Sequence, residues 1–152
     1  MMHSKVYWLT CVLMMFASIA GATTIVMPTD EQLIVKSPLI VEGSVIHSAP
    51  VSRDNAIWTE TTVAVARAIK GSASGTITIR EIGGELDGRI TKVFGTPEYR
   101  DGEHVLLFLT PTPRGDYQTV DLYVGKFAEE TTLAGERLWA RHDDAGDVTL
   151  LD

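Results

Sequence analysis

One long segment of β-forming residues, Ile57–Ile69, constrains the fold of this chain more than any other feature. Its alanines would also suit a helix, but the density of threonine and valine favours a strand. A strand here has five residues on one face: Thr59, Thr61, Val63, Val65 and Ile69. Ordinary strands are roughly five to six residues long. We therefore expect a β-bulge or a strong bend, as in the strands of small closed barrels.

Shorter β-like segments separated by turn sequences fill most of the remaining chain. Val105–Leu109 is uniformly apolar, which is typical of a central strand buried on both faces. A capping box at Thr29–Gln32 predicts a short helix that ends before Pro38, although Leu33–Val35 would suit a strand equally well. The other predicted strands lie in Leu39–His47 (with Leu39, Val41, Val45 and His47 on one side), Thr76–Ile82, Ile90–Phe94, Tyr117–Phe127, and a closing hairpin of Glu136–Arg141 with Val148–Leu151. This pattern predicts an all-β fold, a small OB-like or netrin-like barrel with extra strands and one short N-terminal helix.

Residues 1–22 have the layout of a secretory signal peptide. Lys5 provides a positive charge, and an apolar run over Val6–Ile19 is followed by the small residues Ala20–Ala22. An uncleaved membrane anchor is the alternative, but a transmembrane helix needs roughly twenty apolar residues and this run is shorter. We expect cleavage after Ala22, leaving residues 23–152 as a single exported domain in the periplasm or outside the cell.

Composition argues against several classes of partner and cofactor. The formal net charge is −7, and it becomes one unit more negative when Lys5 is removed. We expect no binding to nucleic acid or to a membrane surface after cleavage, because both require clusters of Lys and Arg. The only cysteine, Cys11, lies in the signal peptide, and the histidines are far apart in sequence. Because Asp143–Asp147 also lacks the spacing of a calcium loop, we expect no metal site and no cofactor.

A glycine-rich loop is the most distinctive local motif. It consists of Gly83, Gly84, Glu85, Asp87 and Gly88 with Leu86 between the acidic residues. It lacks the lysine and the following helix of a phosphate-binding loop. Two interpretations remain open: the glycines supply positive φ angles that the loop requires, or they let the backbone of a partner approach closely.

The carboxylates near this loop also permit two interpretations. Glu81, Glu85 and Asp87 would provide paired carboxylates for acid–base chemistry. The nearby Arg80 and Arg89 favour an exposed, salt-bridged loop instead. Gly71–Gly75 nearly matches the GxSxG motif of serine hydrolases, but Ala73 occupies the position of the nucleophile. We therefore expect a protein that is not an enzyme.

Two tryptophans, Trp58 and Trp139, are predicted to lie at strand starts or edges. If their rings are exposed, they would stack on sugars or anchor a protein partner. Buried packing is the other interpretation for each.

The order of several motifs resembles a family of small exported bacterial proteins of uncharacterised function. The matching segments are Leu39–Gly43, Ala68–Gly71, Gly83-Gly84 with Gly88, Gly95–Pro97, Gly102–Leu109 and Gly125–Phe127. The resemblance implies an exported β-barrel, in a family whose members are sometimes encoded near exported metalloproteases of the matrixin kind. More distantly, the predicted architecture is similar to netrin-like domains, which include tissue inhibitors of metalloproteases. The chain departs from those inhibitors because Thr23 stands where they begin with a zinc-chelating cysteine.

Three functions follow from these features, in decreasing order of support. The first is non-catalytic binding of another protein, such as a matrixin-like metalloprotease or a cell-envelope component, through the loop at residues 83–99 and a sheet edge. The second is binding of a carbohydrate or another small ligand at Trp58 or Trp139. The third is hydrolysis. A tryptophan exposed beside polar groups in a cleft would favour the second, and clustered carboxylates in one pocket would favour the third.

Overall fold

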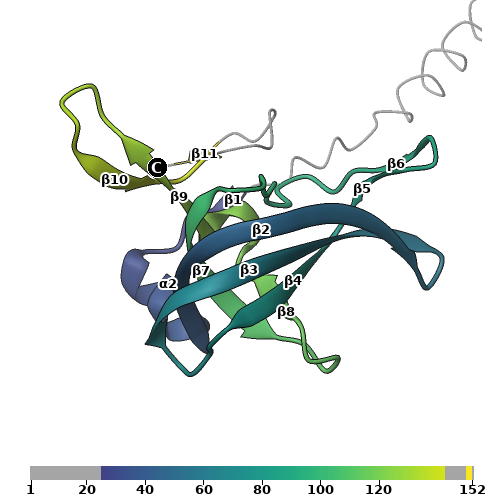
Figure 1. Ribbon diagram of the computed structural model, residues 1–152, viewed down its shortest axis with the longest axis horizontal. Coiled ribbons are helices and arrows are strands. Elements are labelled where there is room, and N and C mark those ends of the chain that lie inside the picture. The colour runs from purple at the N-terminus through teal and green to yellow at the C-terminus, as the bar shows by residue number, and fades with distance from the viewer. Residues whose placement is uncertain (1–24, 143–149, 152) are drawn as a thin grey trace, which may run out of the picture.

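The computed structural model describes residues 25–142 and 150–151, and Figure 1 shows how their strands curl around one another. The predicted signal peptide and the Asp143–Asp147 turn lie outside the described residues. The elements are β1 (Ile25–Val26), α2 (Asp30–Lys36), β2 (Leu39–Arg53), β3 (Ala56–Lys70), β4 (Thr76–Ile82), β5 (Gly84–Leu86), β6 (Arg89–Thr91), β7 (His104–Pro111), β8 (Tyr117–Thr119), the 3-10 turn η1 (Leu122–Gly125), β9 (Lys126–Thr131), β10 (Arg137–Ala140) and β11 (Leu150–Leu151).

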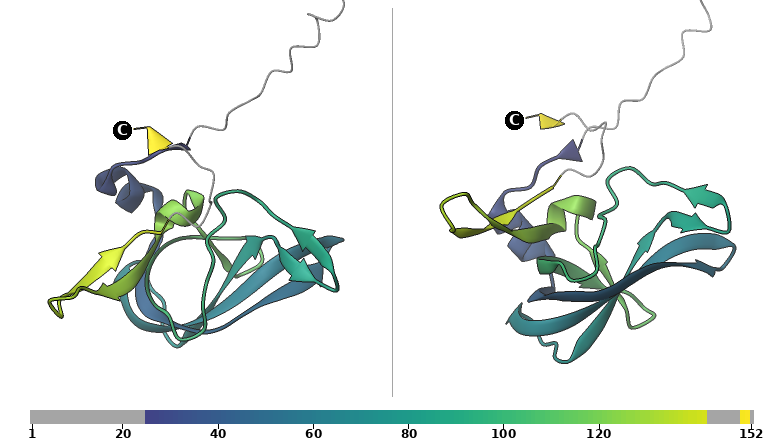
Figure 2. Two further views of the ribbon diagram at one scale, coloured as in Figure 1. Left: turned by 90° about the horizontal axis from the view of Figure 1, so that it is seen from above. Right: turned by 45° about the horizontal axis from the view of Figure 1, so that its top comes forward.

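Seven strands form one sheet in the order β10-β9-β7-β2-β3-β4-β8. An additional pairing of β7 with β8 joins two strands that are far apart in this order, so that β7, β2, β3, β4 and β8 form a ring. Strands β9 and β10 extend the sheet beyond the ring, and Figure 2 shows the curled sheet from two further sides. The predicted all-β, barrel-like fold with one short helix is confirmed.

The long strands β2 and β3 pair along their whole length and bend at three register shifts. The predicted irregularity in the long β segment is therefore confirmed. One bend brings the backbones together at Gly43, where a Cβ atom would lie 2.3 Å from the carbonyl oxygen of Ala64. Any larger residue would push the two strands apart.

The same register shifts overturn two predicted side-chain directions. Ala66 has no partner on β2, so Ala68 packs against the core and Ile69 is exposed. Ile46 has no partner on β3, so His47 is exposed beside Asp101 instead of facing inward with Val45. Strict alternation fails wherever an extra residue enters a strand.

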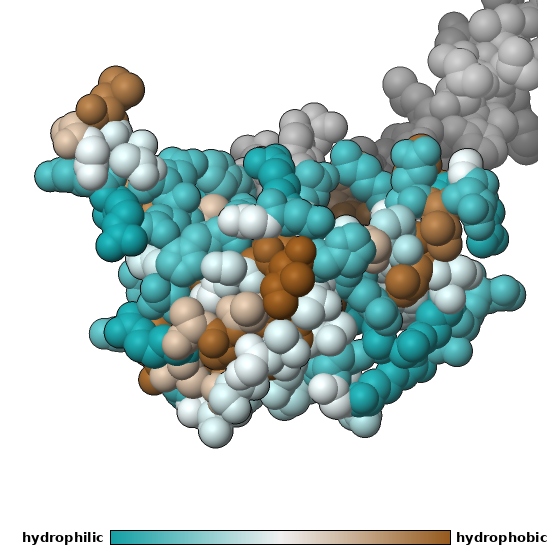
Figure 3. Space-filling view, in the orientation of Figure 1, coloured by the Kyte–Doolittle hydropathy of each residue, from teal (hydrophilic) through white to brown (hydrophobic). Residues whose placement is uncertain are grey.

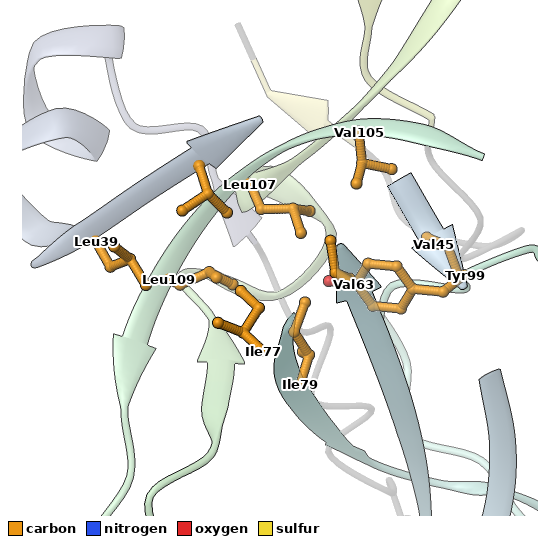
Figure 4. Close-up of a cluster of buried hydrophobic side chains, with 10 residues drawn as sticks. Leu39, Val45, Val63, Ile77, Ile79, Tyr99, Val105, Leu107 and Leu109 are labelled. Carbon is orange, nitrogen blue, oxygen red and sulfur yellow. The ribbon is translucent and has the colours of Figure 1, made fainter. Parts of the chain in front are cut away.

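The core confirms that β7 is buried on both faces. Inside the ring, Val105, Leu107 and Leu109 are fully buried and face residues of β2, β3 and β4 (Figure 4). On the outer face, Phe108 packs with Leu33 of α2 and Ile40 of β2. Helix α2 therefore covers the outer face of the sheet at one end.

The predicted capping box of α2 is present. The Thr29 hydroxyl accepts the N–H of Gln32 at 3.3 Å, and the Gln32 side chain accepts the N–H of Thr29 at 3.0 Å. At the other end, the Ser37 hydroxyl donates to the carbonyl of Leu33 at 2.7 Å. These bonds satisfy backbone groups that a short helix leaves unpaired.

The predicted closing hairpin is wrong. Residues 137–140 form β10, which pairs with β9 across a turn at Thr132–Gly135, whereas β11 runs parallel to β1. Sequence alternation identifies a strand, but it does not identify the strand with which it pairs.

Only one residue pair, Ile79 with Tyr117, joins β4 to β8, and side chains complete this seam. Inside the barrel, the carboxyl group of the buried Glu81 accepts the N–H of Thr119 at 2.7 Å. Outside it, Arg80 forms ion pairs with Glu60 and Asp116. The prediction that Glu81 and Arg80 belong to an exposed, salt-bridged loop is therefore wrong, because both side chains lie in this seam.

Candidate functional site

Gly83 and Gly84 have φ angles of +118° and +131°, which residues with side chains rarely adopt. A Cβ atom at Gly84 would lie 3.0 Å from the Thr59 hydroxyl and 3.1 Å from the Cβ of Pro50. The Thr59 hydroxyl donates to the carbonyl of Gly83 at 2.9 Å. At Gly83, a Cβ atom would lie 2.9 Å from the backbone carbonyl oxygen of Thr91 in the same chain. These angles and contacts favour the conformational interpretation of both glycines. They let the chain leave β4 and lie against β2 and β3.

The other three loop residues form the end of the β5–β6 hairpin. Asp87 and Gly88 both have positive φ, as the two central residues of a tight hairpin turn require. Glu85 and Asp87 are exposed and form no ion pair within the described part of the chain. The exposed loop is therefore as predicted, but its predicted salt bridges are absent among the described residues.

Apolar side chains gather on the outside of this hairpin and the loop after it. Ile90, Val93 and Phe94 are 70%, 37% and 60% exposed, and we call these three residues the hairpin patch. Figure 3 shows hydrophobic surface at the end of the molecule where β5 and β6 lie. A groove of about 280 Å³ lies beside the patch, with Gly83, Gly84 and residues 95–99 in its walls.

Trp58 is half-buried, and its indole N–H has no hydrogen-bond partner among the described residues. It lines a cleft with Arg80, Pro113 and Asp116. Its ring is therefore neither fully buried nor freely exposed.

Trp139 is 38% exposed and lines a second, polar cleft of about 230 Å³. This Trp139 cleft lies on the outer face of the sheet, where β3, β2, β7, β9 and β10 run side by side. Each of these five strands contributes one polar residue to the cleft. In the order from β3 to β10, they are Arg67, Glu42, His104, Glu129 and Arg137. Trp139 lies on β10 with Arg137. Sequence reasoning missed all five of these polar residues as site residues.

A continuous chain of ion pairs and hydrogen bonds joins these polar groups. Arg137 contacts Glu129 at 3.0 Å, and Glu129 forms a short hydrogen bond with His104 Nδ1. His104 Nε2 lies 3.8 Å from Glu42, which accepts from Arg67 at 2.8 Å. The indole of Trp139 lies beside the imidazole, with 5.5 Å between the ring centroids. The cleft therefore has fixed polar walls and an aromatic edge.

Two carboxylates and a histidine in one cleft are the arrangement that would favour hydrolysis. The hydrogen bond from His104 lowers the pKa of the Glu129 carboxyl, and Arg137 acts in the same direction. Glu129 is therefore ionised at neutral pH and holds no proton for a leaving group. A general acid requires the opposite shift.

Two further features of the described residues bear on the class of protein. No group of three or more His, Cys, Asp or Glu side chains among them is placed to hold a metal ion. No helix in the same part of the chain is both long and apolar enough to cross a membrane. Comparison of the chain with protein-family models, curated proteins and solved structures found no match.

Proposed function

We propose that this protein is an exported, non-catalytic β-barrel domain that binds another protein through the hairpin patch. The observation that carries the proposal is the exposure of three large apolar side chains within five successive residues, Ile90–Phe94. Contiguous exposed apolar surface beside polar groups is typical of protein interaction sites. The resemblance described above suggests the class of partner, an exported metalloprotease or an envelope component.

The position of the patch supports this role. Strands β5 and β6 form a separate two-stranded sheet that packs against one end of β2 and β3 (Figure 1). Two exposed charged residues border the apolar side chains: Glu85 lies opposite Ile90 in the hairpin, and Lys92 Nζ lies 5.7 Å from the centre of the Phe94 ring. Interfaces commonly combine a few apolar anchors with a polar rim.

The non-catalytic part of the proposal rests on Glu129. Its carboxyl has a lowered pKa, and it already accepts from His104 and Arg137. The two carboxylates of the Trp139 cleft thus already bond to Arg67, His104 and Arg137, which suits binding better than proton donation.

Affinity capture with matched variants tests the proposal. The purified protein and its Phe94→Ser variant are used as bait in the culture supernatant and envelope fraction of the cells that produce it. Leu133→Ser is the control, because Leu133 is fully exposed in the β9–β10 turn and the substitution removes similar apolar surface. Binding of the captured partner to each variant is then measured by calorimetry.

We expect Phe94→Ser to weaken partner binding by about 30-fold, as for truncation of an aromatic anchor, and Leu133→Ser to leave it unchanged. Circular dichroism should show that both variants are folded. Equal affinity of the wild type and Phe94→Ser for every captured protein would contradict the proposal.

A further inference from the structure

The Trp139 cleft lies at the opposite end of the molecule from the hairpin patch. Strand β10 lies on the left and β5–β6 on the right in all three views (Figures 1 and 2). The two surfaces share no lining residue. A ligand in the cleft would therefore leave the hairpin patch uncovered, and any function of the cleft is separate from the proposed protein binding.

The polar groups of the cleft are held in place before a ligand arrives. Glu129 is fixed from two sides, by His104 and by Arg137 at 3.0 Å. Glu42 is fixed by Arg67 at 2.8 Å. All of these residues lie on paired strands, which position side chains more rigidly than loops do. Preorganised groups lose little conformational entropy on binding, so that even a small ligand can be held.

The charges of the cleft balance one another. Two guanidinium groups, of Arg67 and Arg137, offset the two carboxylates of Glu42 and Glu129. An anionic ligand would meet two carboxylates, and a cationic ligand would meet two guanidinium groups. A neutral ligand escapes both penalties.

Donors and acceptors remain available to such a ligand. The side chains of Arg67 and Arg137 are 69% and 75% exposed, and a guanidinium has five N–H donors. Each carboxylate accepts about four hydrogen bonds, more than these contacts use. A ring that carries several hydroxyls matches this set, because every hydroxyl both donates and accepts.

The aromatic edge completes the match. Trp139 is 38% exposed and lines the cleft. An indole has an apolar face and a polar N–H, and C–H groups on one face of a pyranose ring stack on such a ring. The cleft volume of about 230 Å³ is below the range for drug-sized ligands and suits a single ring. We infer that the Trp139 cleft binds a neutral hexopyranose unit, with Trp139 as the stacking platform and the Arg and Glu side chains bonding its hydroxyls.

Nuclear magnetic resonance titration of the isotope-labelled protein tests this inference. The probes are the neutral methyl glycosides of glucose, galactose and mannose, with glucuronate as the acidic counterpart. We expect saturable shifts of the Trp139 indole signal with at least one neutral glycoside, while the Trp58 indole stays unperturbed. Trp139→Ala should raise the dissociation constant by about tenfold or more, whereas Trp139→Phe, which keeps an aromatic face, should raise it less.

A second variant covers the case in which Trp139→Ala fails to fold. Arg67 is exposed, and Arg67→Met removes its donors while keeping the length of its stem. It should weaken binding several-fold without changing the circular dichroism spectrum. Three results would overturn the inference. These are no saturable shift with any neutral glycoside, tighter binding of glucuronate than of the neutral probes, or Trp139 and Arg67 variants that bind the glycoside as tightly as the wild type does.

Discussion

Glu81 gives the structure a stability that depends on pH. The carboxyl lies at 5% exposure inside the seam between β4 and β8, and this burial raises its pKa from 4.5 to about 7. The hydrogen bond from the Thr119 N–H acts in the opposite direction, but burial dominates. Between these two pH values the folded protein holds a proton that the unfolded chain has lost. Folding is therefore most favoured by Glu81 below pH 4.5, and this contribution disappears as the pH rises through 7.

The change Glu81→Gln removes this titration and keeps an oxygen that can accept the Thr119 N–H. One pKa unit corresponds to about 1.4 kcal/mol, so the shift predicts a loss of about 3 kcal/mol in the wild-type free energy of unfolding between acidic and mildly alkaline pH. The variant should lack this loss. Burying the glutamine amide of the variant costs the same free energy at every pH. This cost would shift the variant's plot of unfolding free energy against pH without changing its slope.

Urea unfolding followed by circular dichroism at several pH values between about 4 and 8.5 measures the effect. The difference in unfolding free energy between Glu81→Gln and the wild type should grow by about 3 kcal/mol across this range in favour of the variant. Glu85→Gln is the control, because Glu85 is exposed in the hairpin and should leave the profile unchanged. Parallel profiles for Glu81→Gln and the wild type would show that Glu81 does not carry the raised pKa.

Three further predictions concern the core, the loop and the N-terminus. Leu107→Asp places a charge where the wild-type side chain is fully buried, so it should cost several kcal/mol of stability, enough to unfold the domain. Leu133→Asp, in an exposed turn, should leave the temperature of thermal unfolding unchanged. Gly84→Ala should lower stability by more than Gly88→Ala, because both residues have positive φ but only Gly84 has neighbours within reach of a Cβ atom. Equal losses of stability in urea titrations would argue against this packing. N-terminal sequencing of the exported protein should begin at Thr23, and a chain that retains Met1 would contradict cleavage after Ala22.

Local sequence signals predicted the elements well. The capping box places α2 correctly because its bonds join residues three positions apart. The uniformly apolar Val105–Leu109 forms the central strand because both of its faces meet apolar layers. The alternation of Ile77, Ile79 and Glu81 on one face of a strand also indicates that Glu81 is buried, as all three are.

The Trp139 cleft depends on information that is not local. Its polar residues come from five strands whose positions in the chain span most of the domain, and only the pairing register brings them together. Trp139 was a candidate from its residue type alone. Its neighbours Glu129 and His104 become identifiable only when β9 is known to pair with both β7 and β10. The extra residues at the bulges in β2 and β3 have the same effect on Ile69 and His47, because each reverses the alternation that follows it.

Hydrogen exchange on the complex with a captured partner tests the central functional claim most directly. Amide exchange is compared between the free protein and the complex, with peptides that cover the hairpin and the β9–β10 strands. We predict that partner binding slows amide exchange in residues 84–94, around the exposed side chains of Ile90 and Phe94, and leaves exchange in β9 and β10 unchanged. Protection confined to β9 and β10, with residues 84–94 exchanging as in the free protein, would contradict it.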